Sequence, residues 1–221
     1  MIESGILLGV DTCGAMGSIA LARLQDGALE LLGEREISGG ELSVALVQGI
    51  ADLLADAGIS VYDLAGITAV VGPGSFTGIR VGLAAVKGLA EAADLPVVTL
   101  SRLALLAESA QAPCAVLDAH RGQFYCGMYG DAEPREMLLT AGEINSMGGL
   151  TGRVGVCEET VAQLLQELYG EPELIRVAPP TADAALRYFL SKWHAGEFAN
   201  VATLDGYYLR GADAKVSAGR H

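Results

Sequence analysis

The chain has 221 residues, of which 51% are hydrophobic and 19% are charged, so it can bury a sizeable core in one large domain or in two smaller lobes. Its formal net charge of −13 argues against stand-alone RNA or DNA binding, because an acidic surface repels phosphate backbones. No apolar run approaches the roughly 20 residues that span a bilayer, and no basic segment of the signal-peptide kind precedes the first apolar run.

The first half of the chain begins with three strand-like segments and continues with alternating helices and strands. Short turns separate the three initial segments, which predicts an antiparallel meander. The order βββαβαβ is that of one ribonuclease H-like lobe. The predicted elements are strands at 5–11, 17–24 and 29–37, a helix at 41–57, a strand at 67–71, a helix at 81–93 and a strand at 96–100.

The second half repeats this beginning with weaker helix signals. Its predicted elements are a helix at 102–109, strands at 114–118, 123–129, 135–139 and 152–156, and helices at 159–168 and 182–194. The expected fold is therefore α/β, a two-lobed actin-like ATPase or ribonuclease H-like fold whose second lobe is degenerate. The lobes are expected at 1–101 and 102–221, and the helix at 182–194 is a candidate to pack back on the first lobe.

The stretch 72–80 joins a buried strand to a helix and is the most informative part of the sequence. Its glycines permit positive φ or close backbone approach, its proline fixes its own φ, and its serine or threonine can cap the amides that open the helix. It matches neither a P-loop, nor a dinucleotide fingerprint, nor a nucleophile elbow in spacing. A packing or assembly loop is expected, with a purely structural turn as the alternative. The loop residues are Gly72, Pro73, Gly74, Ser75 and Thr77.

Both helices of the first half carry more apolar surface than one sheet requires. The apolar positions of the helix that starts near Leu42 sweep about 200° of arc, whereas a core-facing stripe needs only about 100°. The next helix has a face of small residues that would allow another helix to approach closely. Packing of these faces within their own lobe is an equal alternative. The candidate interface residues are Leu42, Leu46, Val47, Ile50, Leu54, Gly78, Gly82 and Ala85.

One aspartate stands at the end of the first strand of each half. Asp11 and Thr12 lie where actin-like ATPases hold a phosphate and a metal, so they are candidates for a degenerate phosphate loop. The segment from Asp118 to Gly122 lies at the matching position but lacks the paired glycines of a second phosphate loop. A phosphate loop from at most one of the two halves would therefore hold a bound ATP or ADP. Capping a turn is the commoner role of an aspartate at a strand end.

The sequence offers no complete catalytic or metal-binding set. Ser75, Asp118 and His120 are the only candidates for a hydrolytic triad, and nothing in the sequence brings Ser75 to the other two. No histidine pair has the helical spacing of a metal site, so no metal and no catalytic residue is expected. The four cysteines form no Cys-x-x-Cys pair, which suits reduced thiols in the cytoplasm.

Four segments resemble the bacterial TsaB (YeaZ-like) family. The segment from Gly72 to Gly82, Gly-Pro-Gly-Ser-Phe-Thr-Gly-Ile-Arg-Val-Gly, is similar to the family signature. Gly9 to Thr12 resembles the opening strand of the family, and Leu117 to Tyr125 resembles its Asp-Ala-Arg-x-Gly-x-x-Tyr segment. Tyr208 to Arg210, with Ala212 and Asp213, resembles its terminal element. The resemblance covers nearly the whole chain.

This resemblance implies a non-catalytic subunit of the machinery that installs threonylcarbamoyl on adenosine 37 of tRNA. The expected partners are the catalytic paralogue TsaD, which family members contact through the first-lobe helices, the ATPase TsaE, and a second copy of the chain. Contact with tRNA is expected only through the complex, and a nucleotide at the lobe cleft or the heterodimer junction is a minor alternative. An ATP-dependent kinase is the competing function, and a peptidase is the third. Gly39-Gly40-Glu41 replaces the family's His-Ser-Glu, which argues against a metal on that helix.

Overall fold

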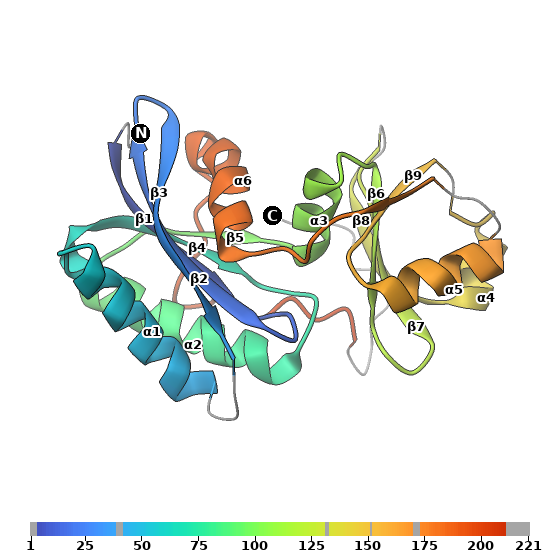
Figure 1. The fold of residues 1–221 in the computed structure, drawn as a ribbon, viewed down its shortest axis with the longest axis horizontal. Helices are drawn as coiled ribbons and strands as arrows, with labels where there is room; N and C mark the ends of the chain where they lie inside the picture. The colour runs from blue at the N-terminus through green and yellow to red at the C-terminus, as the bar shows by residue number, and fades with distance from the viewer. Residues whose placement is uncertain (1–3, 39–41, 131–132, 151, 170–172, 211–221) are drawn as a thin grey trace. The chain divides into compact units, whose positions relative to one another are not determined.

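The computed structural model describes residues 4–38, 42–130, 133–150, 152–169 and 173–210. Its contacts divide the chain into two compact units, residues 1–101 with 181–207 and residues 102–180 with 208–221. Figure 1 shows that each unit is built around one β-sheet with helices packed on it. The expected helix start at Glu41 and the family segment at Ala212 and Asp213 lie outside the described residues.

The sheet of the first unit has the strand order β3-β2-β1-β4-β5. Strands β1, β2 and β3 pair antiparallel, whereas β4 and β5 run parallel to β1, as in Leu8 opposite Leu21 on one side and Ile67 on the other. Strands β1 and β2 are almost wholly buried because helices cover both faces of the sheet, which explains their near-continuous apolar sequences. The strands are β1 (Ser4–Asp11), β2 (Gly17–Gln25), β3 (Ala28–Ile37), β4 (Leu64–Val70) and β5 (Val97–Leu100).

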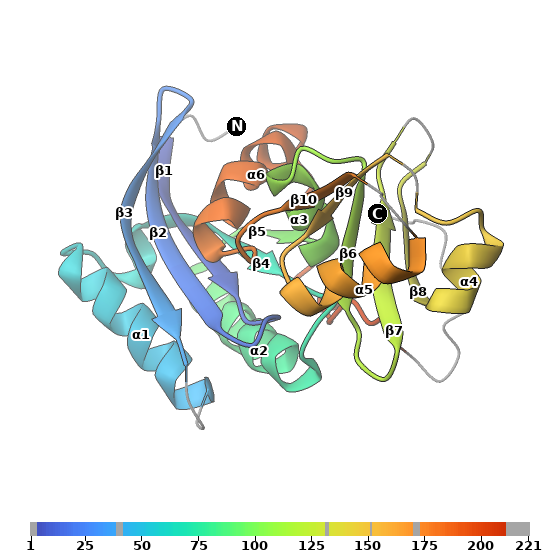
Figure 2. The ribbon, with the colours of Figure 1, turned by 45° about the vertical axis from the view of Figure 1, so that its right-hand side comes forward.

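Helices α1 (Leu42–Asp56) and α2 (Phe76–Ala93) cover one face of this sheet, and α6 (Ala182–Ala195) covers the other (Figure 2). A short 3-10 helix, η1 (Val61–Asp63), precedes β4. Helix α6 lies close to β1 because Gly9 has no side chain there: a Cβ at Gly9 would lie 2.7 Å from Ala182 O. The hydroxyl of Ser18 accepts the Ala182 N–H at 2.8 Å and so fixes the start of the helix.

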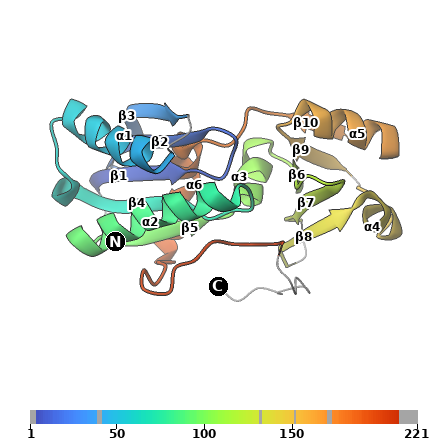
Figure 3. The ribbon, with the colours of Figure 1, turned by 90° about the horizontal axis from the view of Figure 1, so that it is seen from below.

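The segment after α6 runs along the outer side of β5 (Figure 3). Ala199 N donates to Val97 O at 2.8 Å, and Tyr207 N donates to Val71 O at 2.8 Å. The first bond satisfies a carbonyl group of the edge strand β5, and the second satisfies one just after β4. The segment from Thr181 to Tyr207 therefore belongs to the first unit although it follows the second sheet in the chain.

The second sheet has the order β10-β9-β6-β7-β8, which reproduces the pattern of the first sheet. Its first strand, β6, is central, with an antiparallel meander on one side and two parallel strands on the other. This repetition confirms the predicted duplicated α/β fold. The strands are β6 (Cys114–Asp118), β7 (Gln123–Met128), β8 (Arg135–Thr140), β9 (Arg153–Val156) and β10 (Glu173–Arg176), and the helices are α3 (Arg102–Ser109), α4 (Ala141–Ser146) and α5 (Glu159–Tyr169).

The second unit differs from the first mainly in helix length. Helix α4 has 6 residues where α1 has 15, and α5 has 11 where α2 has 18. The sequence does not predict α4 and β10, because both elements are short. A capping box of Thr140 and Glu143 defines the start of α4. Among the residues that the structure describes, no helix is both long enough and apolar enough to cross a membrane.

Candidate functional site

The glycine loop of the first unit closes on the turn that follows β1. Thr12 Oγ1 donates a hydrogen bond to Gly78 O at 2.7 Å. A Cβ at Gly74 would collide with Cys13 O, one at Gly78 with Thr12 O, and one at Gly82 with Thr12 Oγ1, each at well under 3.0 Å. These three glycines therefore make room for residues 12 and 13 of the same unit.

Two backbone amides at the helix end of this loop are hydrogen-bonded inside the unit. Ser75 N donates to Cys13 O at 2.8 Å, and Gly78 N donates to Ser75 Oγ at 3.2 Å. Asp11, which is 2% exposed, accepts the Cys13 N–H at 2.8 Å. Asp11 thus caps its own turn, and the amides of Cys13, Ser75 and Gly78 have partners in the protein.

Helix α2 begins at Phe76, five residues earlier than the sequence predicted. Ser75 is its N-cap residue, so Thr77 and Gly78 lie in the first turn of the helix rather than in a loop. The loop proper is Gly72 to Gly74. Gly72 has a φ of 122°, and a Cβ there would lie 2.6 Å from Tyr207 O, so this position requires glycine.

The predicted interface residues divide into buried and accessible positions. Leu46, Ile50 and Leu54 are buried in the core of the first unit, and Gly78 and Gly82 are buried against Thr12. The earlier interpretation of these two glycines as space for another helix needs correction, because Thr12 fills that space. Leu42 and Ala85 are half-buried and Val47 is exposed, so these three positions stay candidates for an interface.

The accessible apolar surface of α1 lies on its outer face. Val44 and Val47 are 61% and 60% exposed, and Ala51 and Ala55 are exposed at the next helical turns. Their spacing of three and four residues places all four on one side of the helix. We call these four residues the α1 strip. Val44, Val47 and Ala51 are positions of the predicted surplus arc that the core leaves uncovered, and Ala55 extends them by one turn.

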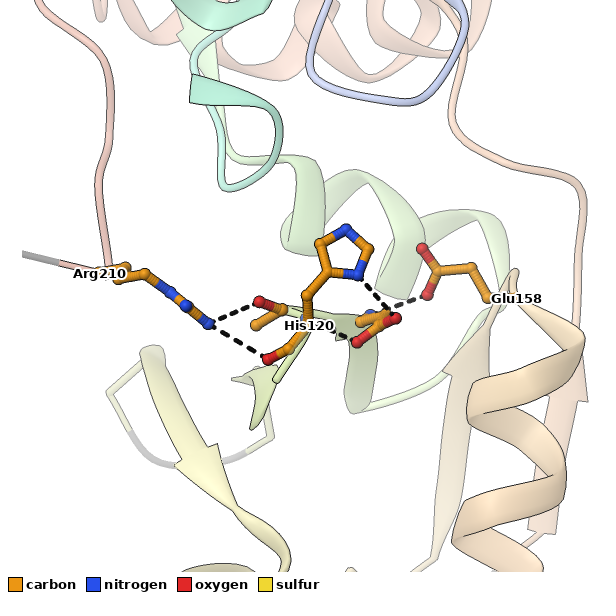
Figure 4. Close-up of polar contacts among 5 residues, drawn as sticks. His120, Glu158 and Arg210 are labelled. Carbon is orange, nitrogen blue, oxygen red and sulfur yellow. Dashed lines mark hydrogen bonds and ion pairs between the residues drawn. The ribbon is translucent and has the colours of Figure 1, made fainter. Parts of the chain in front are cut away.

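A second group of polar residues surrounds the turn that follows β6 (Figure 4). Asp118 Oδ1 accepts the His120 N–H at 2.7 Å, and Asp118 Oδ2 lies 3.1 Å from His120 Nδ1. Glu158 Oε2 accepts the Asp118 N–H at 2.8 Å. Arg210 Nη2 donates to Ala119 O at 2.5 Å and to His120 O at 3.3 Å. Residues from three separate parts of the second unit therefore hold one short turn.

The backbone of this turn is left-handed at three consecutive positions. The φ angles are 60° at His120, 59° at Arg121 and 72° at Gly122. Only glycine adopts this region without steric cost, so the other two residues are strained. The sequence reading missed this feature because it depends on Glu158 and Arg210, which are 40 and 90 residues or so away in the chain.

Burial raises the pKa of the Glu158 carboxyl group above its ordinary value of 4.5. The hydrogen bond from the Asp118 N–H and the charge of Arg102 act in the opposite direction and lower it. Arg102 is itself 8% exposed, and its Nε has no hydrogen-bond partner among the described residues. Among all the residues that the structure describes, no group of three or more His, Cys, Asp or Glu side chains is placed to hold a metal ion.

The hydrolytic candidates serve structural roles. Ser75 Oγ accepts the N–H of Gly78 at the start of α2, and Asp118 binds His120 at the turn after β6. The cysteines resemble small buried hydrophobes: burial raises the pKa of Cys114 to about 11 and that of Cys126 to about 12. These thiols stay protonated at neutral pH.

Two sheets of matching strand order, each with a polar turn after its central first strand, define a duplicated protein of the actin-like, ribonuclease H-like class. The family model for TsaD, tRNA N6-adenosine threonylcarbamoyltransferase, matches residues 36–143. The chain is also similar to a crystal structure from Pseudomonas aeruginosa, that of an uncharacterized protein with similarity to peptidase YEAZ. The two are 26% identical with a TM-score of 0.71, and the match covers 93% of this chain and 100% of the other.

Two curated relatives are named tRNA threonylcarbamoyladenosine biosynthesis protein TsaB. The Bacillus subtilis protein is 36% identical over 91 residues, which are 39% of this chain and 40% of the relative. The Escherichia coli protein is 31% identical over 129 residues, which are 56% of this chain and 54% of the relative. The matched region thus spans about half, or less, of the length of these relatives. Together these matches support a protein of the TsaB (YeaZ-like) family.

Proposed function

We propose that this chain is a non-catalytic subunit in the threonylcarbamoylation of adenosine 37 of tRNA, and that it pairs with a catalytic enzyme of the TsaD family in the cytoplasm. The names of the curated relatives support the pathway, and the TsaD family model supports descent from the same ancestor as the enzyme. A small ATPase of the TsaE type completes the proposed assembly, and tRNA is reached through the complex.

The observation that carries the non-catalytic role is the closed glycine loop. A phosphate cradle needs free backbone amides and open space beside glycines. Here Cys13, Ser75 and Gly78 use their amides within the unit, and Thr12 fills the space at Gly78 and Gly82. The glycines of the first unit therefore serve internal packing. This supports a subunit that provides a binding surface for a partner and does not catalyse a reaction.

The α1 strip is the surface that we propose for the partner. Four apolar residues along one exposed helix face offer an area that a second helix can cover. The strip is flanked by Gln48 and Asp52, whose side chains hydrogen-bond to each other at 2.8 Å and therefore need no partner from another chain. A dimer of this chain would compete for the same strip.

Substitution of Val47 by Asp tests this function. Because Val47 is 60% exposed, Val47→Asp should leave the fold intact, whereas a carboxylate at an apolar contact should weaken association with the TsaD-family enzyme at least tenfold, or about 1.4 kcal/mol. Sedimentation of the mixed proteins measures this. Gln166→Asp adds a charge at an exposed position of α5 and should have no effect.

Two results would contradict the proposal. Association with the enzyme that is unchanged by Val47→Asp removes the α1 strip from the interface. Transfer of threonylcarbamoyl to tRNA by the purified chain without the enzyme removes the non-catalytic role. A third result refines it: if only self-association is lost, the strip serves the homodimer alone.

A further inference from the structure

We propose that the turn of His120, Arg121 and Gly122 is a preformed contact for a phosphate group of RNA. The proposal rests on the proposed function, because it concerns how a subunit of a tRNA-modifying assembly meets the nucleic acid. It goes beyond that function by assigning a contact to the second unit, whereas the α1 strip lies on the first.

The turn is held rigidly at a conformational cost. His120 and Arg121 adopt left-handed φ angles of 60° and 59°, which side chains other than glycine disfavour. Asp118 binds both the backbone N–H and the ring of His120, and Arg210 binds the carbonyl oxygens of Ala119 and His120. Strained backbone that is fixed from several directions is a property of functional sites.

The hydrogen bonds of the turn leave donors on its open side. Arg210 occupies two of its carbonyl oxygens, and the Gln123 N–H returns to His120 O at 3.2 Å. Among the described residues, the N–H groups of Arg121 and Gly122 have no hydrogen-bond partner. A Cβ at Gly122 would meet no atom within 4 Å, so there is room beside these donors.

The exposed side chains of the turn are basic. The His120 side chain is 85% exposed, and Figure 4 shows its second ring nitrogen pointing away from Asp118. Arg121 is exposed and forms no ion pair with a described residue. Both nearby carboxylates form contacts within the second unit: Asp118 binds His120, and Glu158 accepts the Asp118 N–H. A guanidinium beside two free amides matches a phosphate group, which accepts hydrogen bonds from several directions.

The acidic chain limits what one such contact can do. With a net charge of −13 the isolated protein should bind RNA weakly, and the turn adds a local contact to affinity that other subunits supply. A phosphate contact of this kind orients the nucleic acid and carries no sequence information. The expected signature is therefore a local, salt-sensitive response rather than tight binding.

Amide NMR of the full-length chain, titrated with an anticodon stem-loop RNA at low salt, tests the proposal. We expect shifts at the amides of Arg121 and Gly122 that disappear as salt is added. Arg121→Gln should weaken this binding about threefold to tenfold and reduce its salt dependence by about one ion. Arg153→Gln is the control, because Arg153 is an exposed arginine of the same unit that is paired with Glu173.

Three outcomes overturn the proposal: amides of the turn that do not respond to RNA, an equal response to a polyglutamate peptide, or tighter binding of ATP than of RNA at the turn. The first leaves no site, the second indicates an acidic protein partner, and the third a nucleotide. These outcomes are separate from the fate of the proposed function, because they concern the isolated chain. If the chain binds the TsaD-family enzyme while its turn ignores RNA, only the present inference fails.

Discussion

Substitution of Gly82 by alanine should destabilise the first unit, although alanine is the better helix former. Gly82 lies in the middle of α2, and a methyl group there would meet Thr12 Oγ1 at well under 3.0 Å, a separation that real Cβ atoms essentially never show. Thr12 cannot simply rotate away, because its hydroxyl donates to Gly78 O and its Cβ and Cγ2 would also lie 3.3 and 3.4 Å from the new methyl.

The expected magnitude follows from three contributions. Overpacking of a tight core site costs about 1–3 kcal/mol. Displacement of the Thr12 hydroxyl from Gly78 O costs about 1 kcal/mol more. The gain in helix propensity from glycine to alanine offsets about 1 kcal/mol. The net loss in the free energy of unfolding should therefore be about 1–3 kcal/mol.

Gly88 provides a matched control in the same helix. A Cβ at Gly88 meets no atom within 4 Å, so Gly88→Ala should gain the propensity term alone, up to about 1 kcal/mol. Urea unfolding followed by the fluorescence of Trp193 measures both variants, because this single tryptophan is 2% exposed and packs in the first unit against Gly66. In a Thr12→Ala background, Gly82→Ala should cost less than in the wild type.

A stabilising effect of Gly82→Ala, equal to that of Gly88→Ala, would refute this account of the glycine loop. The same geometry decides how Gly82 can be used in binding experiments. An arginine at position 82 would meet Thr12 before it met any partner, so a loss of association in such a variant would report a damaged first unit. Val47 on the α1 strip is the sharper probe.

Two further predictions concern the docking of α6 and the carboxyl group of the second unit. Ser18→Ala leaves the buried N–H of Ala182 without its acceptor and should lower the free energy of unfolding by about 1–3 kcal/mol. Urea unfolding followed by Trp193 fluorescence measures this loss. An unchanged midpoint would show that another acceptor takes over. Burial raises the pKa of Glu158 above 4.5, so the folded chain keeps a proton that the unfolded chain has lost, and stability should fall as the pH rises from 4.5 through the folded-state pKa. Glu158→Gln should therefore gain stability relative to the wild type between about pH 4 and pH 7, measured by circular dichroism, and an equal difference at both pH values would contradict this.

The sequence predicted the first unit well because its elements are long and strongly patterned. The apolar runs of β1 and β2 and the periodicity of α1 and α2 set these elements to within a few residues, except that Ser75 starts α2 earlier than expected. The short elements α4 and β10 escaped because six and four residues carry little periodic signal.

The sequence could indicate the candidate site only in part. Helical periodicity identified surplus apolar surface on α1 but could not tell Val44 and Val47 from Leu46 and Ile50, because that division depends on the packing of α1 on the sheet. The glycines of α2 were recognised as a close-approach face, yet the approaching group, Thr12, lies 66 residues from Gly78. Long-range contacts of this kind leave no local pattern.

The duplication explains why the two halves differ at their most similar positions. In each unit the first strand is central and ends at an aspartate that caps the following turn, Asp11 in one unit and Asp118 in the other. In the first unit the glycine loop packs on the start of this turn, so Cys13, two residues after Asp11, is 1% exposed. In the second unit no glycine-rich segment follows β9, and the turn stays open with His120 exposed. The position two residues after the aspartate is thus internal packing in the first unit and accessible surface in the second, which is why we place the proposed phosphate contact in the second unit.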